Sequence, residues 1–93
     1  MRITWDPEKE KENIRKHKLG FSYAAEVFHD ANRLVRYDEA HSGEEDRYIN
    51  IGKADNEVIV FVVETESGED EIKIITARKA NKRERKAYAD SEL

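Results

Sequence analysis

The feature that most restricts the fold is a run of apolar residues, Val58 to Val63, in a chain whose residues are 41% charged. Successive side chains of a strand point to opposite faces of a sheet, so a run that is apolar at every position predicts a strand buried on both faces. The run is too short to span a membrane. A strand of this kind needs neighbours on both edges, and the surrounding sequence supplies candidates for them.

Strand-like segments flank the apolar run on both sides. Arg47 to Lys53 precedes it and Glu71 to Ala77 follows it, each with alternating apolar positions. Asp55-Asn56 and Ser67-Gly68 supply turns between these segments. A further strand, Arg33 to Tyr37, precedes a polar loop. Three successive strands joined by short turns predict an antiparallel meander.

The first third of the chain predicts one short strand and two helices. Arg2 to Trp5 suits an edge strand, and Asp6-Pro7 provides the cap and first residue of a helix that runs to about Lys18. Gly20 is the expected stop of this helix and Ser22 the expected cap of the next. That second helix carries an apolar stripe at helical spacing, formed by Phe21, Ala24, Ala25 and Phe28.

The fold class predicted from these elements is α+β, in the order β-α-α-β-β-β-β-α. We expect a curved antiparallel sheet with two N-terminal helices packed on it and a short C-terminal helix. The length allows a single domain over residues 1–93. Asn13 and His17, four residues apart beside Ile14, are expected to be semi-buried and to need hydrogen-bond partners.

The charge of the chain is unevenly distributed. The net charge is −4, yet residues 39–71 carry −9 and the remainder carries +5. One surface is therefore expected to be cationic, which suits a phosphate backbone, and another anionic, which suits a basic protein partner. Cysteine is absent, and the first residues lead into charge rather than an apolar signal, so we expect a soluble cytoplasmic protein without disulfides or a membrane segment.

The most basic stretch lies within Glu71 to Tyr88, directly after the last predicted strand. Asn81 can cap a helix there, and Glu84, three residues later, can reach back as the second half of a capping box. Cations at a helix N-terminus oppose the macrodipole, which indicates that an anion such as phosphate binds nearby. A solvated basic helix face is the alternative interpretation. The cations concerned are Arg78, Lys79, Lys82, Arg83, Arg85 and Lys86.

Metal-free cleavage of RNA needs a base for the 2′-hydroxyl proton, cations for the pentavalent phosphorane and an acid for the leaving 5′-oxygen. His17 is the first candidate for proton transfer, because Lys16 and Asn13 lie beside it on the predicted helix. It could instead be a core histidine bonded to the backbone. His29, at a helix end, and His41, in a mobile loop, are weaker candidates.

Two arginines are candidates for holding phosphate. Arg47 starts one predicted strand and Arg78 ends another, so both could face the concave side, and salt bridges to the abundant carboxylates are the alternative. Tyr88 could stack on a base or close the core. Glu44-Glu45-Asp46 lacks a regular ligand spacing, so we expect no metal and no cofactor. The candidate catalytic residues are His17, Lys16, Arg47 and Arg78, and the candidate RNA-binding residues are Lys79, Lys82, Arg83 and Tyr88.

One set of motifs is spread over almost the whole chain: Ile3-Thr4-Trp5-Asp6-Pro7, Asn13, Lys16-His17, Phe21, Ala25, Phe28, Asp46-Arg47 to Ile51-Gly52, Thr76-Ala77-Arg78, Glu84 and Tyr88. In their order and spacing these motifs resemble the BrnT-like toxins of bacterial type II toxin–antitoxin systems, small ribonucleases similar in fold to RelE. The resemblance implies a single BrnT-like toxin domain that cuts RNA and inhibits translation. It also implies a BrnA-like ribbon-helix-helix antitoxin that binds the operator DNA and assembles with the toxin, typically as a heterotetramer.

The chain departs from the family pattern at a few positions. Thr76 stands where serine is usual, Glu64 and Ser67 where an aromatic residue and an arginine are common, and Lys73 where arginine is common. Fewer cations near an RNA path weaken phosphate contacts. A second hypothesis is therefore a catalytically weak or inactive toxin-fold binding module that acts through its antitoxin. A free-standing nucleic-acid-binding domain is a third, which the net charge of −4 disfavours.

Overall fold

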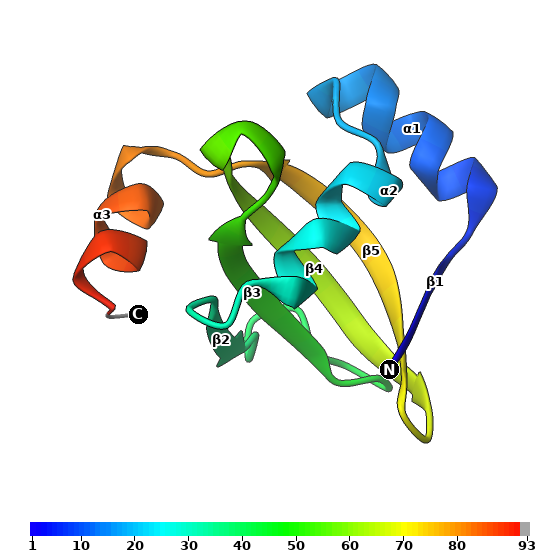
Figure 1. The fold of residues 1–93 in the computed structure, drawn as a ribbon. Coiled ribbons are helices and arrows are strands. Elements are labelled where there is room, and N and C mark those ends of the chain that lie inside the picture. Colours follow the sequence, from blue (N-terminus) through cyan, green and yellow to red (C-terminus); the bar gives the residue numbers. More distant parts are fainter. Residues whose placement is uncertain (92–93) are drawn as a thin grey trace.

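A computed structural model describes residues 1–91 and shows a five-stranded sheet with helices against one face (Figure 1). The strand order is β1-β5-β4-β3-β2, so β4 is the central strand, between β5 and β3, as the apolar run predicted. No helix in the described part is long and apolar enough to cross a membrane. The elements are β1 (Arg2–Trp5), α1 (Pro7–His17), α2 (Phe21–Ala24), the 3-10 helix η1 (Ala25–His29), β2 (Leu34–Tyr37), β3 (Arg47–Lys53), the 3-10 turn η2 (Asp55–Glu57), β4 (Ile59–Gly68), β5 (Glu71–Lys79) and α3 (Lys82–Asp90).

The α+β class and the antiparallel meander of β3, β4 and β5 are confirmed, but the sheet is not wholly antiparallel. β1 lies at the edge, as expected, and pairs in parallel with β5, with Ile3 opposite Ile72. The alternation of side chains in a four-residue strand tells which residues share a face of the sheet. It does not tell which strand lies next to it, or whether the two run parallel or antiparallel. The prediction of a purely antiparallel sheet was therefore wrong at this edge.

The caps of the first two helices are only partly as predicted. Asp6 caps α1 by accepting from the backbone N–H of Glu8, as expected. The helix ends at His17, close to the predicted end at Lys18, but its stop is Lys18 rather than Gly20, because Lys18 adopts the left-handed conformation at φ 59° and donates its backbone N–H to Ile14 O. Gly20 instead precedes α2, and the cap predicted at Ser22 is wrong. A carboxylate of α1 replaces it, since the backbone N–H of Phe21 donates to Glu10 Oε2 at 2.8 Å.

The main core lies between the sheet and the segment of α2 and η1. The stripe predicted as one helix is a single α-turn followed by a 3-10 helix, and its large side chains are buried. Close approach to β3 explains Gly52, because a Cβ there would lie 2.7 Å from Cγ1 of Val27. Fully buried residues from both layers form this core: Phe21, Ala24, Val27, Val60, Val62 and Ile74.

On the opposite face of the sheet, α3 is the one helix among the described residues, and it packs beside β3 (Figure 1). We call this side of the sheet the open face. A smaller apolar cluster of Ile49, Ile51 and Val63 lies on it. The pairing of β4 with β5 shifts register after Val63, which leaves Ile75 as an extra residue and sets Thr76 opposite Val63. The bulge therefore turns Thr76 toward the open face.

A carboxylate is buried on the covered face. Glu64 is 7% exposed, and its Oε2 accepts from Asn50 Nδ2 at 3.0 Å, while its Oε1 has no partner within the described residues. Arg33 reaches it only indirectly, since Arg33 Nε donates to Asn50 Oδ1. Burial raises the pKa of Glu64, and the hydrogen bond from Asn50 opposes this shift without cancelling it.

The buried carboxylate predicts a stability that depends on pH. Because the pKa of Glu64 is raised by folding, its contribution is complete below the ordinary value of 4.5 and is lost as the pH rises through the folded-state value. Glu64→Gln should remove this loss and raise the free energy of unfolding by about 1 kcal/mol at about pH 8. Urea titrations at several pH values measure the free energy of unfolding, with exposed Glu69→Gln as the control. Equal pH slopes for Glu64→Gln and wild type would contradict the prediction.

Candidate functional site

Three arginines from different strands line one hollow on the open face. Arg36 of β2 and Arg47 of β3 meet Arg78 of β5 there, over a floor that includes Phe61. The register explains the convergence, because Arg36 pairs with Ile49 and Arg78 with Phe61, so these side chains share a face. We call this space, about 440 Å³ in volume, the arginine hollow. The expectation that Arg47 and Arg78 face the same side is thus met.

The guanidinium of Arg78 is held in place from two sides. Its Nη1 and Nη2 donate to the two carboxylate oxygens of Glu84 at 2.8 and 2.9 Å, and its Cζ lies 4.0 Å from the centre of the Phe61 ring. Glu84 also accepts from the backbone N–H of Asn81, which completes the predicted capping box. Burial would raise the pKa of Glu84, but the hydrogen bonds from Arg78 and from the Asn81 backbone lower it. The carboxylate thus stays charged and fixes the fork of Arg78.

Arg47 is less completely paired. Its Nη2 lies 3.6 Å from Glu45 Oε1, and its Nε is buried without a hydrogen-bond acceptor within residues 1–91. Buried N–H groups normally have an acceptor, so this one is an unsatisfied donor. The salt bridges considered from the sequence as alternatives therefore occur at both arginines, and they leave part of Arg47 unused.

A second hollow, which we call the helix hollow, shares the lining residue Thr76 with the first. It has a volume of about 260 Å³, and α1 contributes Lys16 and His17 to its lining. Lys16 lies 3.8 Å from Glu12, and His17 is exposed, contrary to the expectation that it is semi-buried. His17 is the last residue of α1, where the helix leaves the sheet.

Asn13 fixes the position of α1 on the sheet. It is 4% exposed, and its Nδ2 donates to the backbone oxygens of Leu19 and Ala77, both at 2.8 Å. Its Oδ1 accepts from Thr76 Oγ1 at 3.0 Å and from the backbone N–H of Ala77 at 3.1 Å. The expectation that this residue is shielded and needs partners is confirmed. The contacts hold the helix hollow next to the bulge, and hence next to the arginine hollow.

The candidate RNA-binding residues do not lie together. Arg83 shares a third hollow of about 370 Å³ with Arg36 and Phe61, next to the arginine hollow. Lys82 is exposed at the first position of α3. Lys79 pairs with Val60, a core residue, so it points to the covered face and away from Arg78.

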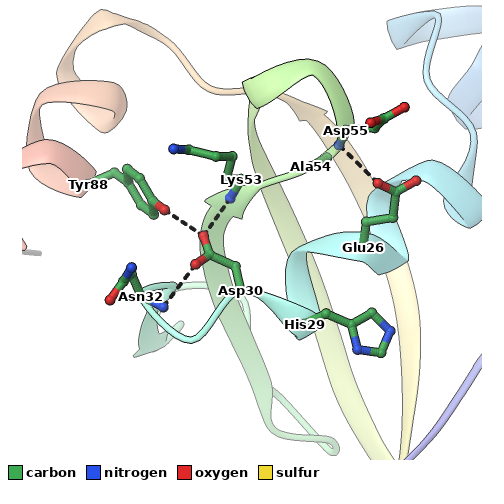
Figure 2. Close-up of a pocket in the computed structure, with 8 residues that line it drawn as sticks. All are labelled: Glu26, His29, Asp30, Asn32, Lys53, Ala54, Asp55 and Tyr88. Carbon is green, nitrogen blue, oxygen red and sulfur yellow. Dashed lines mark hydrogen bonds between the residues drawn. The ribbon is translucent and has the colours of Figure 1, made fainter.

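Tyr88 lies in a different pocket, shown in Figure 2, of about 470 Å³. Its hydroxyl donates to Asp30 Oδ2 at 2.6 Å, and Asp30 also accepts from the backbone N–H groups of Lys53 and Asn32. Burial and this hydrogen bond raise the pKa of Tyr88 to about 12. The ring packs against the apolar cluster of the open face, which supports the core-closing interpretation. Base stacking by Tyr88 stays a prediction.

One pair of side chains in the arginine hollow was not singled out from the sequence. Asp38 follows β2 and is 8% exposed, and both of its carboxylate oxygens lie near Nδ1 of His41, at 3.2 and 3.0 Å. Both residues line the arginine hollow. The Asp-x-x-His spacing just after a strand is the signal that the sequence offered. Within residues 1–91, no group of three or more His, Asp or Glu side chains is arranged to hold a metal ion.

Comparison with known proteins identifies the family. Residues 5–84 match the sequence model of the family described as the ribonuclease toxin, BrnT, of type II toxin–antitoxin systems. The chain belongs to the BrnT family. The crystal structure of the Brucella abortus ribonuclease toxin BrnT matches with a TM-score of 0.69 and 27% identity, over 88% of this chain and 99% of that chain. No curated protein matches the sequence. The BrnT resemblance and the α+β fold are therefore confirmed.

Proposed function

We propose that this protein is a BrnT-type toxin that cleaves RNA without a metal ion and thereby inhibits translation. The observation that carries the proposal is the convergence of Arg36, Arg47 and Arg78 in one hollow of a fold whose family is described as a ribonuclease toxin. Three cations around one space can balance the charge that develops on a phosphorane, and arginine forks match phosphate oxygens.

Six of the eight candidate residues have a role in this proposal. Arg47 and Arg78 hold the reacting phosphate, and Lys16 supplies further positive charge from the helix hollow. His17, in the same hollow, transfers a proton at the reacting centre. Lys82 and Arg83, at the start of α3, guide the adjoining RNA. Phosphate contacts of this kind position a strand without reading its sequence.

We further propose that a BrnA-like ribbon-helix-helix antitoxin neutralises this toxin in the cytoplasm, in a heterotetramer. The family belongs to type II toxin–antitoxin systems, in which the toxin has an antitoxin partner. The net charge of −9 on residues 39–71 suits a basic partner surface. Operator DNA is contacted by the antitoxin in this scheme, which agrees with a toxin of net charge −4.

The direct test is cleavage by the purified toxin. Wild-type protein, free of antitoxin, is incubated with a fluorescent RNA oligonucleotide with and without EDTA, and products are resolved on a gel. We expect equal cleavage in both, since no step needs a metal ion. Loss of cleavage in EDTA that returns with Mg²⁺ would overturn the metal-free mechanism. An inert protein whose induction does not arrest growth would favour the binding-module hypothesis instead.

A further inference from the structure

His41 and Asp38 lie in the arginine hollow in the arrangement of a catalytic dyad. We propose that His41 is the general base of RNA cleavage and that Asp38 is the residue that positions it. This inference rests on the proposed function, because it names the group that takes the proton in the same reaction. It assigns to His41 a role for which the sequence favoured His17.

The loop that carries His41 is fixed at both ends. The backbone N–H of Asp38 donates to Arg47 O at 2.8 Å, so the strand pairing continues past β2. Ser42 then ties the loop, since its N–H and Oγ both donate to Asp38 O and its Oγ accepts from the backbone N–H of Arg47. His41 is thereby held between two anchored residues, and the description of its loop as mobile does not fit these contacts.

The hydrogen bond from His41 to Asp38 determines which ring nitrogen is free. An ionised carboxylate can only accept, so Nδ1 keeps its hydrogen and donates to Asp38, and in the neutral ring Nε2 carries the lone pair. The side chain of His41 is 72% exposed, whereas that of Asp38 is only 10% exposed. A buried carboxylate thus orients an imidazole whose other nitrogen is open to a ligand in the hollow. The same logic orients the base in serine hydrolases.

The other two histidines lack this arrangement. Within residues 1–91, neither His17 nor His29 forms a side-chain hydrogen bond with a carboxylate, and His29 lies in the pocket of Figure 2, apart from the three arginines. His41 alone among the histidines shares a hollow with Arg47 and Arg78. The group that accepts a proton and the groups that balance phosphorane charge are therefore in one place.

The chemical step that follows is a transesterification. Nε2 of His41 takes the proton of the 2′-hydroxyl, and the 2′-oxygen attacks the adjacent phosphorus. Arg47 and Arg78 donate to the non-bridging oxygens as negative charge builds on them. The bond from phosphorus to the 5′-oxygen breaks, and this oxygen keeps the electron pair and receives a proton from His17 or from water. The products are a 2′,3′-cyclic phosphate and a free 5′-hydroxyl.

The first test compares histidine variants on one RNA. His41→Gln should lower kcat about 100-fold while the affinity for an uncleavable 2′-O-methyl RNA stays within about twofold of wild type. His29→Gln is the matched control and should cleave like wild type. Thermal unfolding of each variant shows whether the fold is intact. If wild type and His41→Gln cleave equally, the dyad is wrong and the proposed function stands; if wild type is inert, both fall.

The second test reads the tautomer of His41 and does not depend on a variant that folds. In wild-type protein labelled with ¹⁵N at histidine, neutral His41 should show the Nδ1–H tautomer, and the Nε2–H tautomer would overturn the proposal. Asp38→Asn presents an amide donor to Nδ1, which favours the opposite tautomer, so the ¹⁵N shifts of His41 should become those of the Nε2–H form. We expect kcat to fall about tenfold or more while the RNA affinity stays unchanged. An unchanged rate would exclude a positioning role for Asp38.

Discussion

Replacing Arg78 with alanine is expected to lower kcat for RNA cleavage about 100-fold, because one of the cations that balance the phosphorane charge is lost. The guanidinium of Arg78 sits over Phe61 and faces the arginine hollow together with Arg47. Single-turnover cleavage of a fluorescent RNA measures the effect. Arg78→Lys should recover only a small part of the rate, since an ammonium group cannot reproduce the planar fork.

Variants of Glu84 separate the loss of the Arg78 cation at the phosphate from the destabilisation caused by an unpaired Glu84 carboxylate. Arg78→Ala leaves the carboxylate of Glu84, 17% exposed, without its partner, and this alone destabilises the start of α3. The double variant Arg78→Ala/Glu84→Gln removes the unpaired charge and should remain as inactive as Arg78→Ala. Glu84→Gln alone keeps an acceptor for the backbone of Asn81 and one for Arg78, so it should lower the rate far less than Arg78→Ala does. A loss with Glu84→Gln as large as with Arg78→Ala would show that the ion pair matters, rather than contact with phosphate.

Asn13→Ala is expected to lower the free energy of unfolding by about 3 kcal/mol, the largest effect on stability that we predict. The substitution deprives four groups at Thr76, Ala77 and Leu19 of their partner in a place that water does not reach easily. Urea or thermal unfolding measures the change. Asn32→Ala, at an exposed position, is the control and should change stability by less than about 0.5 kcal/mol.

Loss of activity should accompany Asn13→Ala even where the variant remains folded. The contacts of Asn13 with Thr76 and Ala77 set the helix hollow beside the arginine hollow. Cleavage measured well below the melting temperature separates the two effects. A variant of wild-type stability and wild-type rate would contradict the assigned role of Asn13.

Local patterns predicted most of the elements themselves. The period of two identified the strands of the meander, and the capping box at Asn81 and Glu84 needed only a spacing of three residues. These features depend on near neighbours in the chain. Strict alternation from Ile74 would set Arg78 on the covered face, and it is the bulge at Ile75 that brings Arg78 to the arginine hollow.

Features that depend on distant contacts were missed. The direction of β1 is decided by its partner β5, far along the sequence. The pairing of Asp38 with His41 lies in a loop without periodicity, where only backbone contacts to Ser42 and Arg47 fix its shape. No local pattern distinguishes such a loop from a mobile one.

The parallel pairing of β1 with β5 bears on how the protein is made. Ile3 cannot pair with Ile72 until β5 has left the ribosome. The first strand therefore stays unpaired while the earlier strands of the meander are synthesised. The hydrogen bond from Asn13 to the backbone oxygen of Ala77 likewise forms only after β5 has emerged. The nascent chain therefore completes this edge of its sheet, and the seat of α1 on it, only after β5 has left the ribosome.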